Sequence, residues 1–110
     1  MKSINVFWRS TSYRLGQVTN DYEDAMDLVE DFIWDNGVFE TDGDPLWVFT
    51  EGELSFVLRL AHTHRGYVSD GIGGGKCEET RVVNMFDEKA QWMNVVTLQH
   101  EREIEEGEID

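Results

Sequence analysis

Only one segment of this chain has the spacing of an amphipathic helix, and this limits the fold more than any other feature. It runs from about Asp21 to about Trp34, where Thr19 or Asn20 can cap its start and Asn36-Gly37 is a typical stop. Its apolar positions fall on one stripe, formed by Tyr22, Met26, Val29 and Ile33 and flanked by Ala25 and Phe32. The sequence therefore predicts a single helix with one face on a core.

The other apolar segments have the patterns of strands. They are residues 3–9, 46–49, 54–60, 81–86 and 92–98. Residues 54–60 alternate most clearly, with Leu54, Phe56 and Leu58 on one face, and Glu51-Gly52 before them is typical of a tight turn. Residues 46–61 are therefore predicted to form a hairpin.

This order of elements, β-α-β-β-β-β, predicts an α+β fold in which one helix covers a face of an antiparallel sheet of about five strands. We expect a single domain over residues 1–100 and a disordered acidic tail over residues 101–110. Residues 10–18 are expected to be a polar connection, and residues 62–78 a mobile hairpin loop. One helix leaves part of the second sheet face uncovered, which allows a homodimer.

Negative charge is concentrated in part of the chain. The net charge is −14, from 23 acidic and 9 basic residues. Residues 15–58 contain no Lys, Arg or His but many carboxylates, and residues 101–110 are also strongly acidic. Such a field repels nucleic acid and anionic lipid and attracts basic protein surfaces. Direct binding to DNA, RNA or a membrane is therefore the first class of function that the charge excludes.

The polar side of the predicted helix is almost entirely acidic. Glu23 and Asp27, Asp27 and Asp31, and Asp31 and Asp35 are like-charge pairs one turn apart, which destabilise a helix. These acids either form a solvated face or bind a partner. Trp34 projects on the same side, where it is an exposed interface anchor or, if the helix ends earlier, is tucked beneath it.

Residues 62–78 contain the only candidate for chemistry. His62, His64 and Cys77 are ligand types that zinc prefers, but their spacing matches no standard site. The glycines before Lys76 do not form a phosphate loop, because Asp70 stands where its first glycine is required and Cys77 replaces the hydroxyl residue. We predict no catalytic residue, no metal and no cofactor.

The location is expected to be cytoplasmic. No apolar run is long enough for a membrane helix, and the N-terminal residues lack the pattern of a signal peptide. The single cysteine, Cys77, cannot form an internal disulfide and agrees with a reducing compartment.

These features predict a non-enzymatic acidic protein that inhibits or neutralises a basic protein which handles nucleic acid, such as a nuclease. In size and composition the chain is similar to phage-encoded DNA mimics and bacterial immunity proteins, although no motif aligns. The residues expected to contact the partner are Glu23, Asp24, Asp27, Glu30, Asp31, Trp34, Asp35, Glu40, Asp42 and Asp44.

Two alternatives belong to other classes. One is a small enzyme or metal-binding domain that uses the region of His62, His64 and Cys77. The other is an acidic housekeeping domain from a halophile, which the low lysine content favours. The confinement of the acidic excess to residues 15–58 and the tail argues against the halophile, because a halophile protein is expected to spread its charge evenly.

Overall fold

Six strands and one helix make up the described part of the chain, which in this computed structural model comprises residues 1–19, 22–40, 43–69, 71 and 74–104. In chain order the elements are β1 (Lys2–Trp8), β2 (Thr11–Val18), α1 (Tyr22–Asn36), β3 (Leu46–Thr50), β4 (Glu53–Ser69), β5 (Gly75–Phe86) and β6 (Trp92–Ile104). Among the described residues, no helix is both long and apolar enough to cross a membrane.

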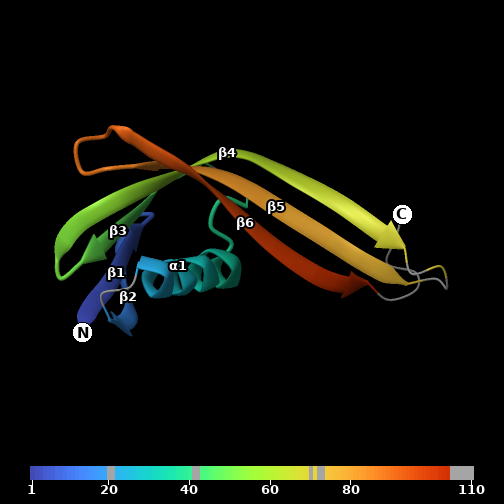
Figure 1. Cartoon of the computed structure of the whole chain (residues 1–110), viewed down its shortest axis with the longest axis horizontal. Coiled ribbons are helices and arrows are strands. Elements are labelled where there is room, and N and C mark those ends of the chain that lie inside the picture. Colours follow the sequence, from blue (N-terminus) through green and yellow to red (C-terminus); the bar gives the residue numbers. More distant parts are fainter. Residues whose placement is uncertain (20–21, 41–42, 70, 72–73, 105–110) are drawn as a thin grey trace.

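The strands form one open sheet in the order β2-β1-β3-β4-β5-β6, and every pair of neighbours is antiparallel. The α+β class is therefore confirmed, with six strands in place of about five. The helix lies against one face of the sheet (Figure 1). Its first described residue and its last lie within two positions of the predicted bounds.

The core lies between α1 and this face of the sheet. Val29 and Ile33 of the helix are fully buried, as the predicted apolar stripe requires. They belong to one cluster with inward residues of all six strands, such as Val6 of β1, Val48 of β3 and Leu58 of β4. Burying one such side chain contributes about 1.5–3 kcal/mol. The alternation of the strands therefore determines which sheet face receives the helix.

Strands β4, β5 and β6 continue past the helix as a three-stranded extension, which gives the molecule its elongated shape of 50 × 26 × 24 Å (Figure 1). We call residues 64–69, 75–80 and 99–104 the β-arm. His64 pairs with Thr80 and Thr80 with Gln99 at its base, and Gly75 pairs with Ser69 and Ile104 at its far end. The arm is held mainly by its strand ladders, since most of its described side chains in β4 are exposed.

Two sequence predictions about these elements are wrong. Residues 11–18, expected to be a connection, form β2, which is ordered by pairing with β1. Residues 62–69 and 75–78, expected to be loop, belong to β4 and β5. The first four residues of the acidic tail, 101–104, continue β6, and residues 105–110 lie outside the described residues, so the disorder expected beyond the tail's first residues stays a prediction. The rejection of a phosphate loop is confirmed, because a strand begins at Gly75 where such a loop requires a helix.

The sheet face opposite α1 carries an apolar row across five strands. Phe7 pairs with Trp47, Trp47 with Val57, Val57 with Phe86, and Phe86 with Trp92. Phe7 and Trp92, at the two ends of this row, are 40% and 59% exposed. The described residues therefore leave part of the second sheet face uncovered, as expected from a fold with one helix.

Candidate protein-binding surface

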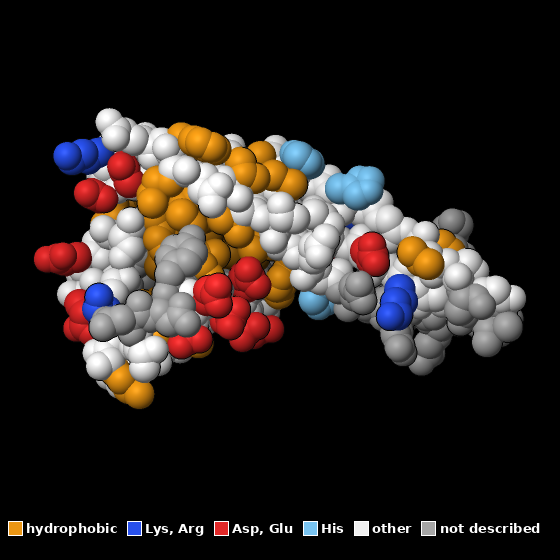
Figure 2. All heavy atoms as spheres, viewed as in Figure 1, with side chains coloured by type: hydrophobic (Ala, Val, Ile, Leu, Met, Phe, Trp, Pro, Cys, Tyr) orange, Lys and Arg blue, Asp and Glu red, His pale blue; other side chains and the backbone are white. Residues whose placement is uncertain are grey.

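Six carboxylates and no Lys or Arg lie on α1. They form the acidic helix face, which consists of Glu23, Asp24, Asp27, Glu30, Asp31 and Asp35. All are exposed except Glu30, which is partly buried. Acidic side chains gather over the helix on the surface shown in Figure 2. The structure thus brings together six of the ten residues predicted to contact a partner.

Repulsion between neighbouring carboxylates of this face affects the pKa of Glu30. Partial burial raises the pKa of its carboxyl above the ordinary value of 4.5, and the charges of Asp27 and Asp31 raise it further. None of these three residues, nor Asp35, forms an ion pair with a Lys or Arg in the described part of the chain. A cation from outside the chain would relieve this repulsion.

Trp34 is not an exposed anchor. Its ring is partly buried, with the guanidinium of Arg81 4.3 Å from the ring centroid and the imidazole of His100 stacked at 5.0 Å. The helix does not end early, and Trp34 is covered because β5 and β6 pass close to the C-terminal end of α1 (Figure 1). Trp34 therefore joins the acidic helix to the sheet and offers a partner little of its surface.

Arg81 makes the junction between β5 and the end of the helix. Its side chain is only 5% exposed, and its Nη1 donates a hydrogen bond to the carbonyl oxygen of Val38 at 2.5 Å. Its Nη2 lies 2.6 Å from Oε2 of Glu79. Its Nε has no hydrogen-bond partner among the described atoms. The buried charge is thus compensated by one carboxylate, one carbonyl and the face of the Trp34 ring.

Glu79 is shared by two arginines. Its other oxygen, Oε1, accepts a hydrogen bond from Nε of Arg65 at 2.5 Å. Partial burial acts to raise the pKa of Glu79, but the hydrogen bonds and charges of Arg65 and Arg81 outweigh it and hold the pKa below the ordinary value. The hydrogen bond from Arg65 to Glu79 also raises the pKa of Arg65.

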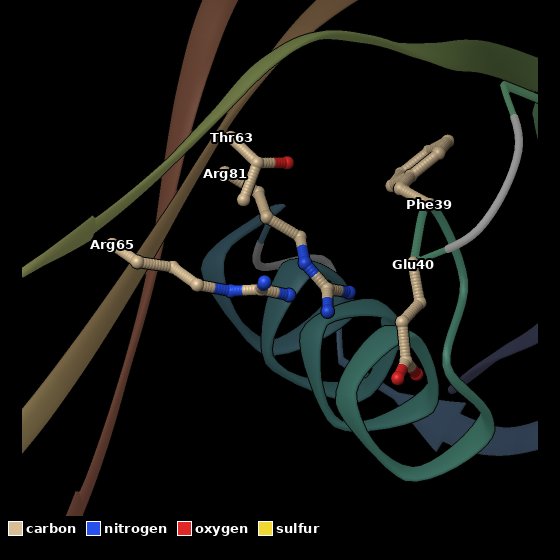
Figure 3. A pocket seen from close by; sticks show the side chains of 5 residues that line it. All are labelled: Phe39, Glu40, Thr63, Arg65 and Arg81. Carbon is tan, nitrogen blue, oxygen red and sulfur yellow. The ribbon is translucent and has the colours of Figure 1, made fainter. Parts of the chain in front are cut away.

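A pocket of about 340 Å³ lies beside this network. It is lined by Phe39 and Glu40 from the segment after α1, and by Thr63, Arg65 and Arg81 from the sheet. The guanidinium groups of Arg65 and Arg81 lie close to each other near the helix end, and Glu40 lies on the other side with its carboxylate turned away from them (Figure 3). Because the arginines are already paired with Glu79, the pocket has mixed charge and is not a strongly cationic anion site.

The remaining predicted contact residues do not all join the acidic helix face. Glu40 is exposed just after α1 and lies at the pocket described above. Asp44 pairs with Arg9 at 3.4 Å, beside a hollow lined by Phe7 and Trp47 and by no residue of α1. Asp42 lies outside the described residues.

The three residues of the alternative chemical site are separated by the strand register. His64 of β4 lies opposite Thr80, and Tyr67 lies opposite Cys77. Residues an odd number of positions apart in a strand point to opposite faces, so Cys77 lies on the face opposite His62 and His64. Among the described residues, no group of three or more His, Cys, Asp or Glu side chains could hold a metal ion.

No protein-family model, curated protein or solved structure matches this chain.

Arg81 and its partners are the residues of this region that the sequence reasoning missed. A signal was present, because Arg81 has the same strand parity as Val83 and Met85, both of which are buried. An arginine on the inward face of a strand needs an acceptor nearby. The alternation therefore indicates a buried ion pair, although it does not reveal that Trp34 of the helix is involved.

Proposed function

We propose that this chain is a non-enzymatic binding protein whose acidic helix face docks on a basic surface of a protein that handles nucleic acid, and blocks that surface. The observation that supports it best is the set of six carboxylates on α1, which has no Lys or Arg of its own. Three of these carboxylates form like-charge interactions centred on Glu30 that are not relieved within the described chain.

The geometry of a helix suits this role. Carboxylates one turn apart lie about 5–6 Å from each other. A row of that spacing can face a series of Arg and Lys side chains arranged to contact successive phosphates. Attraction between exposed charges speeds association and is screened by salt. Binding of the partner should therefore be fast and should weaken strongly as the ionic strength rises.

The proposal excludes enzymatic chemistry in the region of His62, His64 and Cys77. The register directs Cys77 and the two histidines to opposite faces of the sheet, so they do not form one constellation. A cytoplasmic location fits the proposal, because Cys77 is a free thiol. A phage-encoded nucleic-acid mimic and a toxin immunity protein both fit this mode of binding, and the identity of the partner distinguishes them.

The test is capture of proteins from a host lysate at low salt, followed by identification and binding measurements with the purified protein. Two variants with the same change of net charge are compared. Asp27→Lys with Asp31→Lys reverses charge on α1, whereas Glu78→Lys with Glu88→Lys reverses it at exposed positions of β5 and the turn after it. Only the helix variant should lose affinity, by at least about tenfold.

The captured protein must also bind nucleic acid, and duplex DNA or RNA should compete with this chain for it. Equal loss of affinity in the two variants would show that net charge alone drives binding. If saturating nucleic acid does not displace this chain, the chain binds the captured protein at a surface other than its nucleic-acid-binding surface. The first result contradicts docking by the acidic helix face, and the second contradicts the proposed block of nucleic-acid binding.

A further inference from the structure

The free edge of β6 differs from the rest of this acidic molecule. β6 is the last strand of the sheet and spans 13 residues, Trp92–Ile104, paired with β5 on one side only in the described structure. Residues 90–100 contain no Asp, Glu, Lys or Arg, in a chain whose net charge is −14. Among the described residues no strand covers the outer side of β6 and no charge guards it from Trp92 to His100, although the Val95 amide already donates a hydrogen bond to Oδ1 of Asn94 at 2.8 Å.

The opposite edge of the sheet is protected. β2 carries the exposed Arg14, and its pairing register with β1 shifts between Arg14 and Gly16, which interrupts the regular edge. Charges and bulges of this kind prevent edge strands from pairing with other chains. In β6 the register shift lies near the start, between Trp92 and Asn94, and the strand beyond it is regular.

We propose that β6 pairs antiparallel with β6 of a second copy of this chain, so that the two sheets become one continuous sheet. A two-fold axis through the middle of the pair makes the same residues meet from both sides. Backbone hydrogen bonds then satisfy the free edges of both copies. This inference does not depend on the proposed function.

The charge pattern favours a second copy as the occupant of this edge. β6 is neutral from Trp92 to His100 and carries charge only near its end, at Glu101, Arg102 and Glu103. Antiparallel pairing centred on the neutral part places the acidic end of each strand beyond Trp92 of the other copy. The acidic segments thus lie at opposite ends of the seam. The basic partner proposed above has no charge to recognise on the neutral part of this edge.

The side chains of β6 also suit such a seam. Trp92 and Val95 are 59% and 43% exposed, and by register they share the sheet face that carries the apolar row. Pairing brings these side chains beside those of the second copy and removes apolar surface from water. Because the axis runs perpendicular to the sheet, both helices lie on the same face of the joined sheet.

The experiment measures the mass of the full-length chain by analytical ultracentrifugation over a wide range of concentrations. Wild type should form a dimer. Val95→Lys with Thr97→Lys adds like charges across the seam at exposed positions and should weaken the dimer by at least about tenfold. Ser12→Lys with Gln17→Lys adds the same charge to β2, at exposed positions on the same sheet face, and should leave the dimer intact.

Hydrogen exchange locates the contact. The outward amide protons of β6 should become protected as the concentration rises through the dimer range. A monomer at every concentration overturns the proposal. It is also overturned if the β6 variant still dimerises while Phe7→Ser, at the far end of the apolar row, does not, because the copies would then pack face to face.

Discussion

The guanidinium of Arg81 lies 4.3 Å from the centre of the Trp34 ring, and one of its nitrogens donates a hydrogen bond to the carbonyl of Val38. The first contact holds the last turn of α1, and the second holds the segment that follows it. His100 of β6 covers Trp34 as well. A single buried arginine therefore joins the acidic helix to the base of the β-arm.

Replacing this arginine should destabilise the fold. Arg81→Ala leaves the Val38 carbonyl without its donor and Glu79 without one of its two arginines, and it uncovers the Trp34 ring. We expect the free energy of unfolding to fall by about 2–3 kcal/mol. Urea denaturation measures it. Arg59→Ala, at an exposed position, should change it by less than about 0.5 kcal/mol. Equal effects of the two variants would contradict the structural role of Arg81.

Glu30→Gln should stabilise the protein at neutral pH. Partial burial and the charges of Asp27 and Asp31 raise the folded-state pKa of Glu30 above 4.5, so the ionised carboxylate carries a penalty. The penalty is full above the raised pKa and disappears as the pH falls through it toward 4.5. Removing the charge should gain a few tenths of a kcal/mol per like-charge contact.

Thermal unfolding of wild type and Glu30→Gln at neutral pH and below pH 4.5 tests this sign. The difference in melting temperature should be present at neutral pH and absent in acid. Glu53→Gln makes the same chemical change at an exposed carboxylate and should have no such effect. A Glu30→Gln variant that is less stable than wild type at neutral pH would show that Glu30 is stabilising.

Glu79 should show the opposite pH dependence. Its folded-state pKa is held below 4.5, so its ionised form contributes stability that is present above pH 4.5 and is lost as the pH falls through the lower value. At neutral pH, Glu79→Gln should cost about 1–2 kcal/mol, because it leaves Arg81 buried without a charged partner. The gap between wild type and variant should close in acid. A gap that does not depend on pH would show that the loss is one of packing.

Gly75 should be intolerant of a side chain. A Cβ at this position would collide with the backbone carbonyl oxygen of Val68 and approach the Tyr67 ring to 2.8 Å. Gly66, on the neighbouring strand, has no atom within 4 Å of the equivalent position. Gly75→Ala should therefore speed hydrogen exchange at the far end of the β-arm, whereas Gly66→Ala should not. Equal exchange in the two variants would contradict the close approach at Gly75.

The helix and the hairpin of residues 46–61 were predictable because their apolar residues repeat with a clear period. The acidic helix face follows from the same helix, since carboxylates occupy the positions that the apolar stripe leaves free. β2 was missed because Thr11–Val18 has polar residues at its start and a glycine at a register shift, and pairing with β1 orders it. The local sequence pattern of residues 11–18 gives no indication that they pair with β1.

The β-arm and the environment of Trp34 depend on contacts between distant segments. Residues 62–69 show no apolar period because both faces of β4 are largely exposed there, so the strand is visible only from its partners. Trp34 lies on the acidic side of the helix in the sequence pattern, yet Arg81 and His100 cover it. Sequence predicts which side of a helix faces away from its core, but not which strand crosses that side.

The sheet order also bears on how the chain reaches this fold. Every ladder except that of β1 with β3 joins strands that are consecutive in the chain, so those pairs can form as local hairpins. Pairing of Ile4 with Thr50 must instead close the segment that holds most of the unbalanced negative charge. Mutual repulsion opposes that closure. Added salt should therefore accelerate refolding, although it should weaken binding of the proposed partner.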